Sequence, residues 1–121
     1  MILVDTSVWV DHLRAGRRDL EAELERSAVL IHPLILGEIA LGNLARRDEV
    51  LGLLAGLPTA VVGTTSEVLA FIEQYRLYGL GIGYVDVHLL VATALTADAR
   101  LWTLDRRLAR AANQLNLAAD V

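Results

Sequence analysis

Apolar residues follow two alternating patterns along the chain. Short, almost wholly apolar runs predict β-strands at residues 2–4, 28–31, 59–62 and 101–104, with a short final strand at 116–118. Between these runs, apolar residues recur every three or four positions, which is typical of helices that bury one face. The predicted helices cover residues 8–13, 34–44, 47–55, 65–77 and 84–96, with one more beginning at Asp19 and a last one at Asp105.

This alternation of strands and helices predicts the fold class. Strands with almost no polar residues are buried on both faces, which favours a parallel sheet between two layers of helices. Because crossovers between parallel strands are right-handed, we expect an α/β fold, a three-layer α/β/α sandwich with a central parallel sheet of four to five strands. The 121 residues suit a single domain, 1–121, with a sizeable core.

Composition excludes several classes of protein. A hydrophobic fraction of 55% excludes intrinsic disorder. Because the chain has no cysteine, a disulfide framework, a thiolate metal site and a cysteine nucleophile are excluded too. The longest stretch with a single acid, residues 77–97, carries three glycines and a histidine, so no membrane span is expected. With no secretory signal before Asp5, we expect a cytoplasmic protein that does not contact membranes.

The basic residues form small local groups in a chain of net charge -4. This acidic balance argues against a non-specific coat on nucleic acid, which is normally strongly basic. All eleven basic residues are arginine, however, and a local arginine group can still bind phosphate. For any single group, a solvated helix face is the better interpretation. The groups are Arg14, Arg17 and Arg18; Arg46 and Arg47; and Arg106, Arg107 and Arg110.

Three lone carboxylates stand in segments that otherwise have the composition of a core. Asp5 is the only charge in residues 1–10, Glu38 the only one in 27–45, and Asp86 the only one in 77–97. Burying an ionised carboxylate without a partner costs several kcal/mol. A helix cap or an arginine partner would explain any one of them as well as a function does. Three in separate segments call for a shared explanation.

The predicted fold places two acids at one edge of the sheet, and four if the helices with Asp86 and Glu38 start at that edge. Asp5 and Asp105 follow predicted strands, Asp86 lies in the first turn of its helix, and Glu38 lies one turn into its own. Carboxylates this close raise one another's pKa unless a cation lies between them. Oxygen ligands without His or Cys suit Mg²⁺ or Mn²⁺ rather than zinc. The chemistry that follows is metal-assisted attack of water on a phosphodiester.

Four segments together resemble a known family. They are ILVDTSVWVDHL at the start, the helix with Glu38, GIGYVDVHLLVATAL around Asp86, and LWTLDRRLARAA around Asp105. These segments look like a PIN domain, and more narrowly like the VapC toxins of type II toxin–antitoxin pairs. The resemblance covers essentially the whole chain. It implies the three-layer parallel fold and an Mg²⁺- or Mn²⁺-dependent endoribonuclease that leaves a 5′-phosphate and a 3′-hydroxyl.

The resemblance also assigns roles to the four acids. Asp5, Glu38, Asp86 and Asp105 match the family's acidic quartet, as catalytic residues and metal ligands. It implies that Asp5 and Asp86 are the most direct ligands. Glu38 and Asp105 would complete the shell, through water or by orienting the attacking hydroxide.

Hydroxyl and arginine side chains near these acids are further candidates. Thr6, Ser7 and Thr103 match small hydroxyl residues of the family, and helix capping or turn hydrogen bonds are an equally good explanation for them. Arg106 and Arg107 depart from many relatives, which have an acidic or neutral residue after the last acid. The predicted RNA contacts are Arg14, Arg106 and Arg107.

Partners follow from the same resemblance. It implies an RNA substrate, a small VapB-like antitoxin that inserts a segment near the acids, and contact with DNA only through that antitoxin. The helix at 84–96 is apolar almost all round, so it is either wholly buried or half of a homodimer interface, and the resemblance favours a homodimer. An apolar groove around the helices between Leu34 and Leu54 is the candidate docking surface for the antitoxin.

Other readings of the sequence are weaker. His12, His32 and His88 lack metal-ligand spacing, and Trp9 and Trp102 suit packing better than base stacking. A receiver domain needs a lysine, which the chain lacks, and a HAD-type phosphatase needs a second Asp where Ser7 stands. The remaining alternatives are a PIN-domain RNA-processing nuclease without an antitoxin and a catalytically inactive PIN module that binds RNA or protein.

Overall fold

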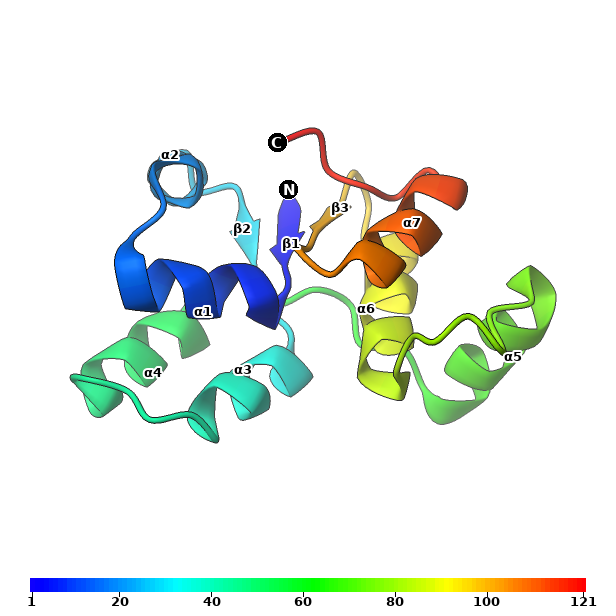
Figure 1. Ribbon diagram of the computed structural model, residues 1–121, viewed down its shortest axis with the longest axis horizontal. Coiled ribbons are helices and arrows are strands. Elements are labelled where there is room, and N and C mark those ends of the chain that lie inside the picture. The colour runs from blue at the N-terminus through cyan, green and yellow to red at the C-terminus, as the bar shows by residue number, and fades with distance from the viewer.

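The computed structural model describes residues 1–121 and consists of three strands and seven helices (Figure 1). In chain order they are β1 (Ile2–Val4), α1 (Thr6–Ala15), α2 (Arg18–Glu25), β2 (Val29–Leu30), α3 (Pro33–Ala40), α4 (Arg47–Ala55), α5 (Thr65–Tyr75), α6 (Tyr84–Leu95), β3 (Arg100–Trp102) and α7 (Arg106–Gln114).

The sheet is parallel, as predicted, with the strand order β2-β1-β3. Its ladder has three strands, and the other two predicted strands make one parallel bridge each, Ile31 with Thr59 and Leu101 with Ala118. The segment after Thr59 leaves the sheet. There the backbone N–H of Val61 donates to Thr96 Oγ1 and not to a carbonyl of a neighbouring strand. The predicted sheet is therefore correct in type and shorter in its two outer strands.

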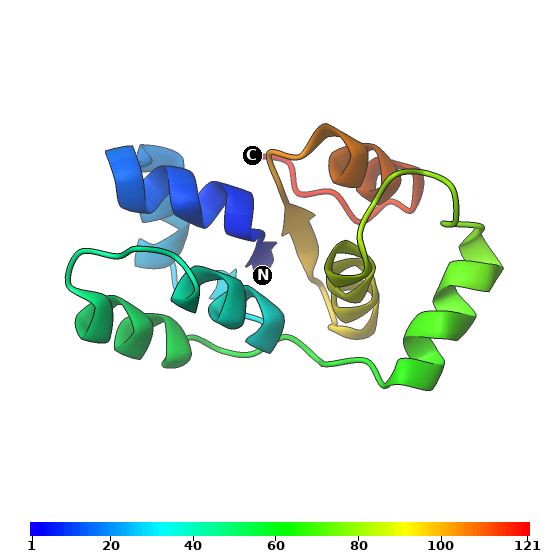
Figure 2. The ribbon, with the colours of Figure 1, turned by 60° about the horizontal axis from the view of Figure 1, so that its bottom comes forward.

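Helices cover the sheet on both faces (Figure 2). α1, α3 and α4 lie on one side of the strands, and α6 and α7 lie on the other. α5 packs on the outside of α6 and extends away from the rest of the molecule. The three-layer α/β/α arrangement is the one that right-handed crossovers require.

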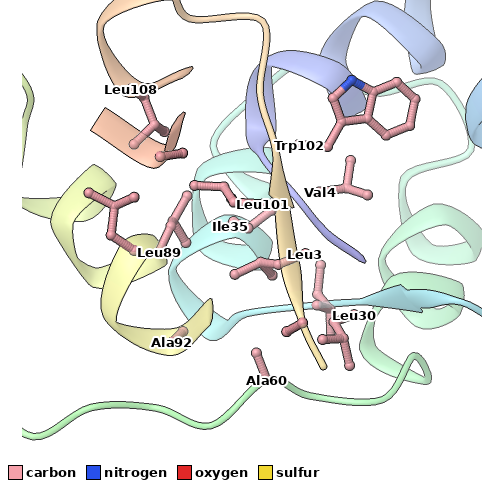
Figure 3. Packing of buried hydrophobic residues seen from close by; sticks show 14 of the residues in the cluster. Leu3, Val4, Leu30, Ile35, Ala60, Leu89, Ala92, Leu101, Trp102 and Leu108 are labelled. Atoms are coloured by element: carbon pink, nitrogen blue, oxygen red, sulfur yellow. The ribbon is translucent and has the colours of Figure 1, made fainter. Parts of the chain in front are cut away.

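One hydrophobic core of 25 buried residues holds these layers together (Figure 3). Leu3 and Leu101 come from the strands, Ile35 from one helical layer, and Leu89 and Leu108 from the other; each is at most 2% exposed. The middle of α6 is buried within the chain, so packing explains its apolar surface there. Its end residues Tyr84 and Leu95 are 49% and 42% exposed.

One helix ends earlier than the sequence predicts. α3 ends at Ala40, four residues before the predicted end at 44. The guanidinium of Arg47 donates to the carbonyls of Ala40 and Gly42, so a side chain from the next helix caps α3.

None of the helices is long and apolar enough to span a lipid bilayer.

Candidate active site

Asp5 lies directly after β1, where its backbone starts α1, and its side chain is held from two sides. It is only 6% exposed. Its Oδ2 accepts hydrogen bonds from Ser7 Oγ and Thr103 Oγ1, each at 2.7 Å. Hydrogen bonds to a buried carboxylate offset part of its desolvation. Both hydroxyls bind Oδ2, and Oδ1 accepts no hydrogen bond from the protein.

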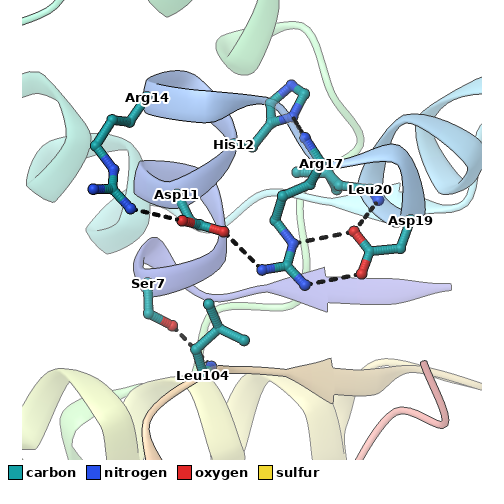
Figure 4. A network of polar contacts seen from close by, with 8 residues as sticks. All are labelled: Ser7, Asp11, His12, Arg14, Arg17, Asp19, Leu20 and Leu104. Carbon is teal, nitrogen blue, oxygen red and sulfur yellow. Dashed lines mark hydrogen bonds and ion pairs between the residues drawn. The ribbon is translucent and has the colours of Figure 1, made fainter.

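The hydroxyls of Ser7 and Thr103 also join the start of α1 to the segment after β3. Ser7 Oγ accepts the backbone N–H of Leu104 at 3.0 Å (Figure 4). Thr103 Oγ1 accepts the backbone N–H of Asp105, also at 3.0 Å. One small network therefore sets the distance between the segments that carry Asp5 and Asp105.

Thr6 holds Glu38, the acid that the sequence places on a different segment. Thr6 Oγ1 donates to Glu38 Oε1 at 2.6 Å, which joins the first turn of α1 to α3. The start of α1 has no side-chain cap. Helix capping, which was one explanation for Thr6 and Ser7, is therefore not their role here, because both hydroxyls bind carboxylates of the candidate site.

Asp105 caps α7, the helix that it was predicted to begin. Its Oδ1 accepts the backbone N–H groups of Arg107 and Leu108 at 2.9 and 3.1 Å. These are two of the donors that a helix leaves unpaired at its N-terminus. The other carboxylate oxygen, Oδ2, accepts no hydrogen bond from the protein.

Asp86 lies in the first turn of α6, and its environment favours the protonated form. Its Oδ2 accepts the backbone N–H of Gly83 at 3.1 Å. Burial raises the pKa of Asp86 above its usual value, against the lowering effect of the Gly83 N–H. The negative charges of the other three acids raise this pKa further; they are Asp5, Asp105 and Glu38. The structure therefore brings all four acids to one edge, where they repel each other.

None of these four acids has a cationic partner. The salt bridges of the chain join Arg14 to Asp11, Arg17 to Asp11 and Asp19, and Arg26 to Glu23. A cluster of carboxylates without a counter-charge is stabilised by a bound cation.

The residues present fit a hard divalent cation. No three carboxylates or imidazoles are close enough to form a complete metal cage. Mg²⁺ does not need one, because it keeps several waters and takes one or two carboxylates directly. Asp5 Oδ1 and Asp105 Oδ2 are not used by the protein, and the donors are all oxygen, which suits Mg²⁺ or Mn²⁺.

The predicted RNA-contacting arginines lie in different surroundings. The side chain of Arg14 is 77% exposed and forms an ion pair with Asp11, and it lines the same groove as Glu38. Arg106 and Arg107 are exposed at the start of α7. The Arg107 guanidinium rests on the loop before α6, where Nη1 donates to Gly81 O at 3.4 Å.

Arg17, grouped above with Arg14 and Arg18 as a phosphate-binding candidate, is already engaged by the protein (Figure 4). It forms ion pairs with Asp11 and Asp19 and lies 5.4 Å from the centre of the Trp102 ring. The hydrogen bonds that its guanidinium donates to both carboxylates raise the pKa of Arg17. The acid two residues later in the sequence, Asp19, is the feature that could have predicted this ion pair.

The remaining candidates are structural, as expected. His12 Nδ1 accepts the backbone N–H of Arg17, and His32 Nδ1 caps α3 by accepting that of Leu34. Burial lowers the pKa of His32, so this histidine is neutral. Trp9 and Trp102 are 3% and 6% exposed, which excludes them as open stacking surfaces.

Comparison with known proteins identifies the family. The chain matches the family model described as PIN domain over residues 2–114. It is also similar to two curated relatives, both named Ribonuclease VapC32, from Mycobacterium tuberculosis strains CDC 1551 / Oshkosh and ATCC 25618 / H37Rv. Identity to each is 48% over 118 residues, which cover 98% of this chain and 95% of the relative. The chain therefore belongs to the PIN-domain family, in its VapC ribonuclease branch.

Proposed function

We propose that this chain, as one domain over residues 1–121, is the toxin of a type II toxin–antitoxin pair and acts as a metal-dependent endoribonuclease in the cytoplasm. The observation that carries the proposal is the set of four carboxylates at one edge of the sheet, none paired with a cation. The 48% identity to proteins named ribonuclease supports RNA as the substrate.

In the proposed reaction, the protein positions charge and the cation supplies reactivity. Mg²⁺ or Mn²⁺, when bound, lowers the pKa of water and neutralises charge on the scissile phosphate. Asp5 and Asp86 are the direct ligands that we propose, with Glu38 and Asp105 completing the shell. The Ser7 and Thr103 hydroxyls fix Oδ2 of Asp5 and leave Oδ1 for the cation. Thr6 holds Glu38 at the same edge, where its carboxylate can orient water.

RNA contact falls to arginines around this edge. Arg14 and Arg106 are exposed, and a guanidinium can bind phosphate through two parallel hydrogen bonds. Arg107 shares the first turn of α7 with Arg106 and exposes part of its side chain to RNA. Because the net charge is -4, these few side chains provide the local attraction for RNA.

We place the antitoxin in a groove of about 480 Å³ between α1, α3 and α4. Its walls are mostly apolar, including Leu13 and Val50, and Glu38 lies in its lining. A second apolar cavity of about 310 Å³ is also lined by Leu13 and Val50. Its lining includes Leu53, which is 69% exposed. A segment with apolar side chains and one arginine fits both the walls and the acids. DNA would be contacted only through this partner.

A homodimer is the second assembly that we propose. Exposed apolar side chains occur on α5, at the start of α6 and in the loop between them; they are Leu69, Tyr75, Tyr78, Leu80 and Tyr84. Exposed apolar side chains of this kind suit burial against a second copy. One chain has a mass of 13.2 kDa, and sedimentation should give twice this value. Leu69→Glu should reduce the measured mass to that of one chain. A wild-type monomer at high concentration would contradict the dimer.

The test of the proposed activity is induction in a bacterial host. Wild type should arrest growth and produce discrete RNA cuts with 5′-phosphate ends, and Asp5→Asn and Asp86→Asn should do neither. Asp48→Asn, a matched change of an exposed acid on α4, should behave as wild type. Co-expression of the small protein encoded beside the gene should relieve the arrest.

Other outcomes would favour the alternatives. Arrest that survives both substitutions without RNA cuts would mean that the acids are structural and that the protein acts by binding. RNA cuts without arrest, and without any protein that relieves it, would indicate an RNA-processing nuclease. Purified protein should cut RNA with Mn²⁺ and lose this activity in EDTA.

A further inference from the structure

The loop between α5 and α6 lies against α7, and one arginine crosses it. Figure 2 shows this loop passing beside α7 on its way into α6. Arg107, in the first turn of α7, donates through Nη1 to the carbonyl of Gly81 at 3.4 Å. A small cavity of about 60 Å³, lined by Leu80, Arg107 and Arg110 among others, lies between the loop and α7.

Glycine at position 81 is what allows this contact. A Cβ at Gly81 would lie 2.6 Å from Nη1 of Arg107, 3.1 Å from its Cζ and 3.2 Å from its Cδ. The arginine therefore occupies the space in which any other residue has its side chain. Gly81 also has a φ of +78°, in the left-handed region.

Gly79 provides a natural comparison. Its φ of +75° is nearly the same, yet a Cβ added there would meet nothing within 4 Å. The backbone alone favours glycine at 79, whereas at 81 both the backbone and the space taken by Arg107 favour it. The two positions separate backbone strain from the arginine contact.

The contact joins the segments that carry two of the four acids. Two residues after Gly81, the N–H of Gly83 donates to Asp86 Oδ2 and sets the direction of that carboxylate. At the other end, the backbone N–H of Arg107 donates to Asp105 Oδ1. Arg107 thus binds Asp105 through its backbone and the loop before Asp86 through its side chain.

We infer that Arg107 is a positioning residue for the acidic site: it fixes the loop at Gly81 and thereby sets the Asp86 carboxylate relative to Asp105. The inference rests on the proposed function for what the two acids bind. It gives Arg107 a task that does not depend on RNA, in addition to any phosphate contact made by its exposed side. A residue that orients a ligand typically contributes about 10- to 100-fold to metal affinity.

The first test measures Mn²⁺ binding by calorimetry on the full chain without RNA. Arg107→Gln should weaken binding about 10-fold while the melting temperature changes little. Arg107→Lys, which keeps a charged donor, should recover part of this loss. Arg106→Gln, an exposed neighbour with no contact to the loop, should bind Mn²⁺ as wild type does. At saturating Mn²⁺, Arg107→Gln should lower kcat more than it raises the RNA KM.

The second test uses the two glycines. Gly81→Ala should weaken Mn²⁺ binding about as much as Arg107→Gln, because the new Cβ displaces the guanidinium. Gly79→Ala imposes a similar backbone strain and should leave the Mn²⁺ affinity unchanged. Combining Gly81→Ala with Arg107→Gln should add little further loss, because both changes remove one interaction.

Amide hydrogen exchange at Gly83 keeps the inference testable without catalysis. Its N–H should exchange about 10-fold faster in Arg107→Gln and Gly81→Ala than in Arg106→Gln and Gly79→Ala. A wild type that binds Mn²⁺ but cuts no RNA would contradict the proposed function. The inference would then be tested by the relative exchange rates of the Gly83 N–H in the four variants. Equal exchange in all four variants, or an Arg107→Gln protein changed only in its RNA KM, would overturn the inference.

Discussion

Two groups of acids in this chain differ in whether an arginine neutralises them. In the corner between α1 and α2, Asp11 and Asp19 share Arg17, whose hydrogen bonds hold the pKa of each carboxyl below its usual value. At the carboxyl edge of the sheet, Asp86 has no cationic partner, and burial raises its pKa. The first arrangement is complete within the chain. We propose that a cation from outside the chain completes the second.

This difference shows that a carboxylate's partners, more than its burial, indicate its role. Asp5 is buried and fixed by two hydroxyls, but hydroxyls orient a charge without neutralising it. Arg17 both orients and neutralises its acids, so that corner contributes to stability. The acidic edge keeps its repulsion in the metal-free protein, as expected where function opposes stability.

The largest expected effect is on activity at the uncompensated edge. Asp5→Asn should lower the rate of RNA cleavage by at least about 100-fold at saturating Mn²⁺, because a neutral amide is a poor ligand for a hard cation. The amide oxygen still accepts the bonds from Ser7 and Thr103, so the fold should be retained. Cleavage rates with the purified variant measure this, and Asp48→Asn is the control. An Asp5→Asn protein with wild-type rates would remove the distinction between the two regions.

The next effect is on the stability of the compensated corner. Arg17→Gln should lower the free energy of unfolding by about 1–2 kcal/mol, because it removes two ion pairs and the contact with Trp102. Urea unfolding measures the loss. RNA cleavage should be unchanged, since Arg17 contacts none of the four acids. If Arg17→Gln unfolded as wild type does, the corner would contribute nothing to stability.

A smaller effect of opposite sign is expected at Asp86. Asp86→Asn should raise the free energy of unfolding of the metal-free protein by about 0.5 kcal/mol, because it removes a half-buried charge repelled by three others. The amide oxygen can still accept the Gly83 N–H. Asp105→Asn is a useful comparison, because asparagine caps helices as well as aspartate does. A destabilised Asp86→Asn would mean that the edge is not strained.

The smallest effect is the pH dependence of the metal-free protein. The raised pKa of Asp86 makes the folded state bind more protons, so stability rises as pH falls through that pKa towards 3.8. The pKa values of Asp11 and Asp19 are lowered, so their contribution is present above 3.8 and is lost as pH falls below it. Urea midpoints between pH 7 and pH 3, in steps of about half a unit, should show both trends. Asp86→Asn should abolish the first trend and Arg17→Gln the second; a wild type whose stability falls steadily from pH 7 would contradict the assignment.

The sequence predicted the parallel fold and the four acids for the same reason. Strands and helices with strong periodicity keep their type in the fold, and an isolated charge in an apolar segment stands out without any structure. Asp105 was expected at the start of its helix, and it is the N-cap. The outer strands were overestimated because apolar composition does not show where ladder pairing ends.

Contacts between distant segments were not predictable. The bond from Thr103 to Asp5 joins residues 98 positions apart, so the sequence alone favoured local caps and turns for these hydroxyls as much as a role beside the acids. Arg47 ends α3 from the following helix, and Arg107 reaches the glycine at 81 from 26 positions away. Composition and spacing contain no signal for such pairs until the strand order brings them together.

The most direct test of the acidic edge is the effect of Mn²⁺ on unfolding of the wild type, Asp5→Asn, Asp86→Asn and Arg17→Gln. A cation that binds only the folded state at about 100 times its Kd should raise the free energy of unfolding by about 2.7 kcal/mol. The account predicts this gain for wild type and Arg17→Gln, and little or none for the two acid variants. A wild type that unfolds at the same urea concentration with and without Mn²⁺, or a gain that persists in both acid variants, would contradict it.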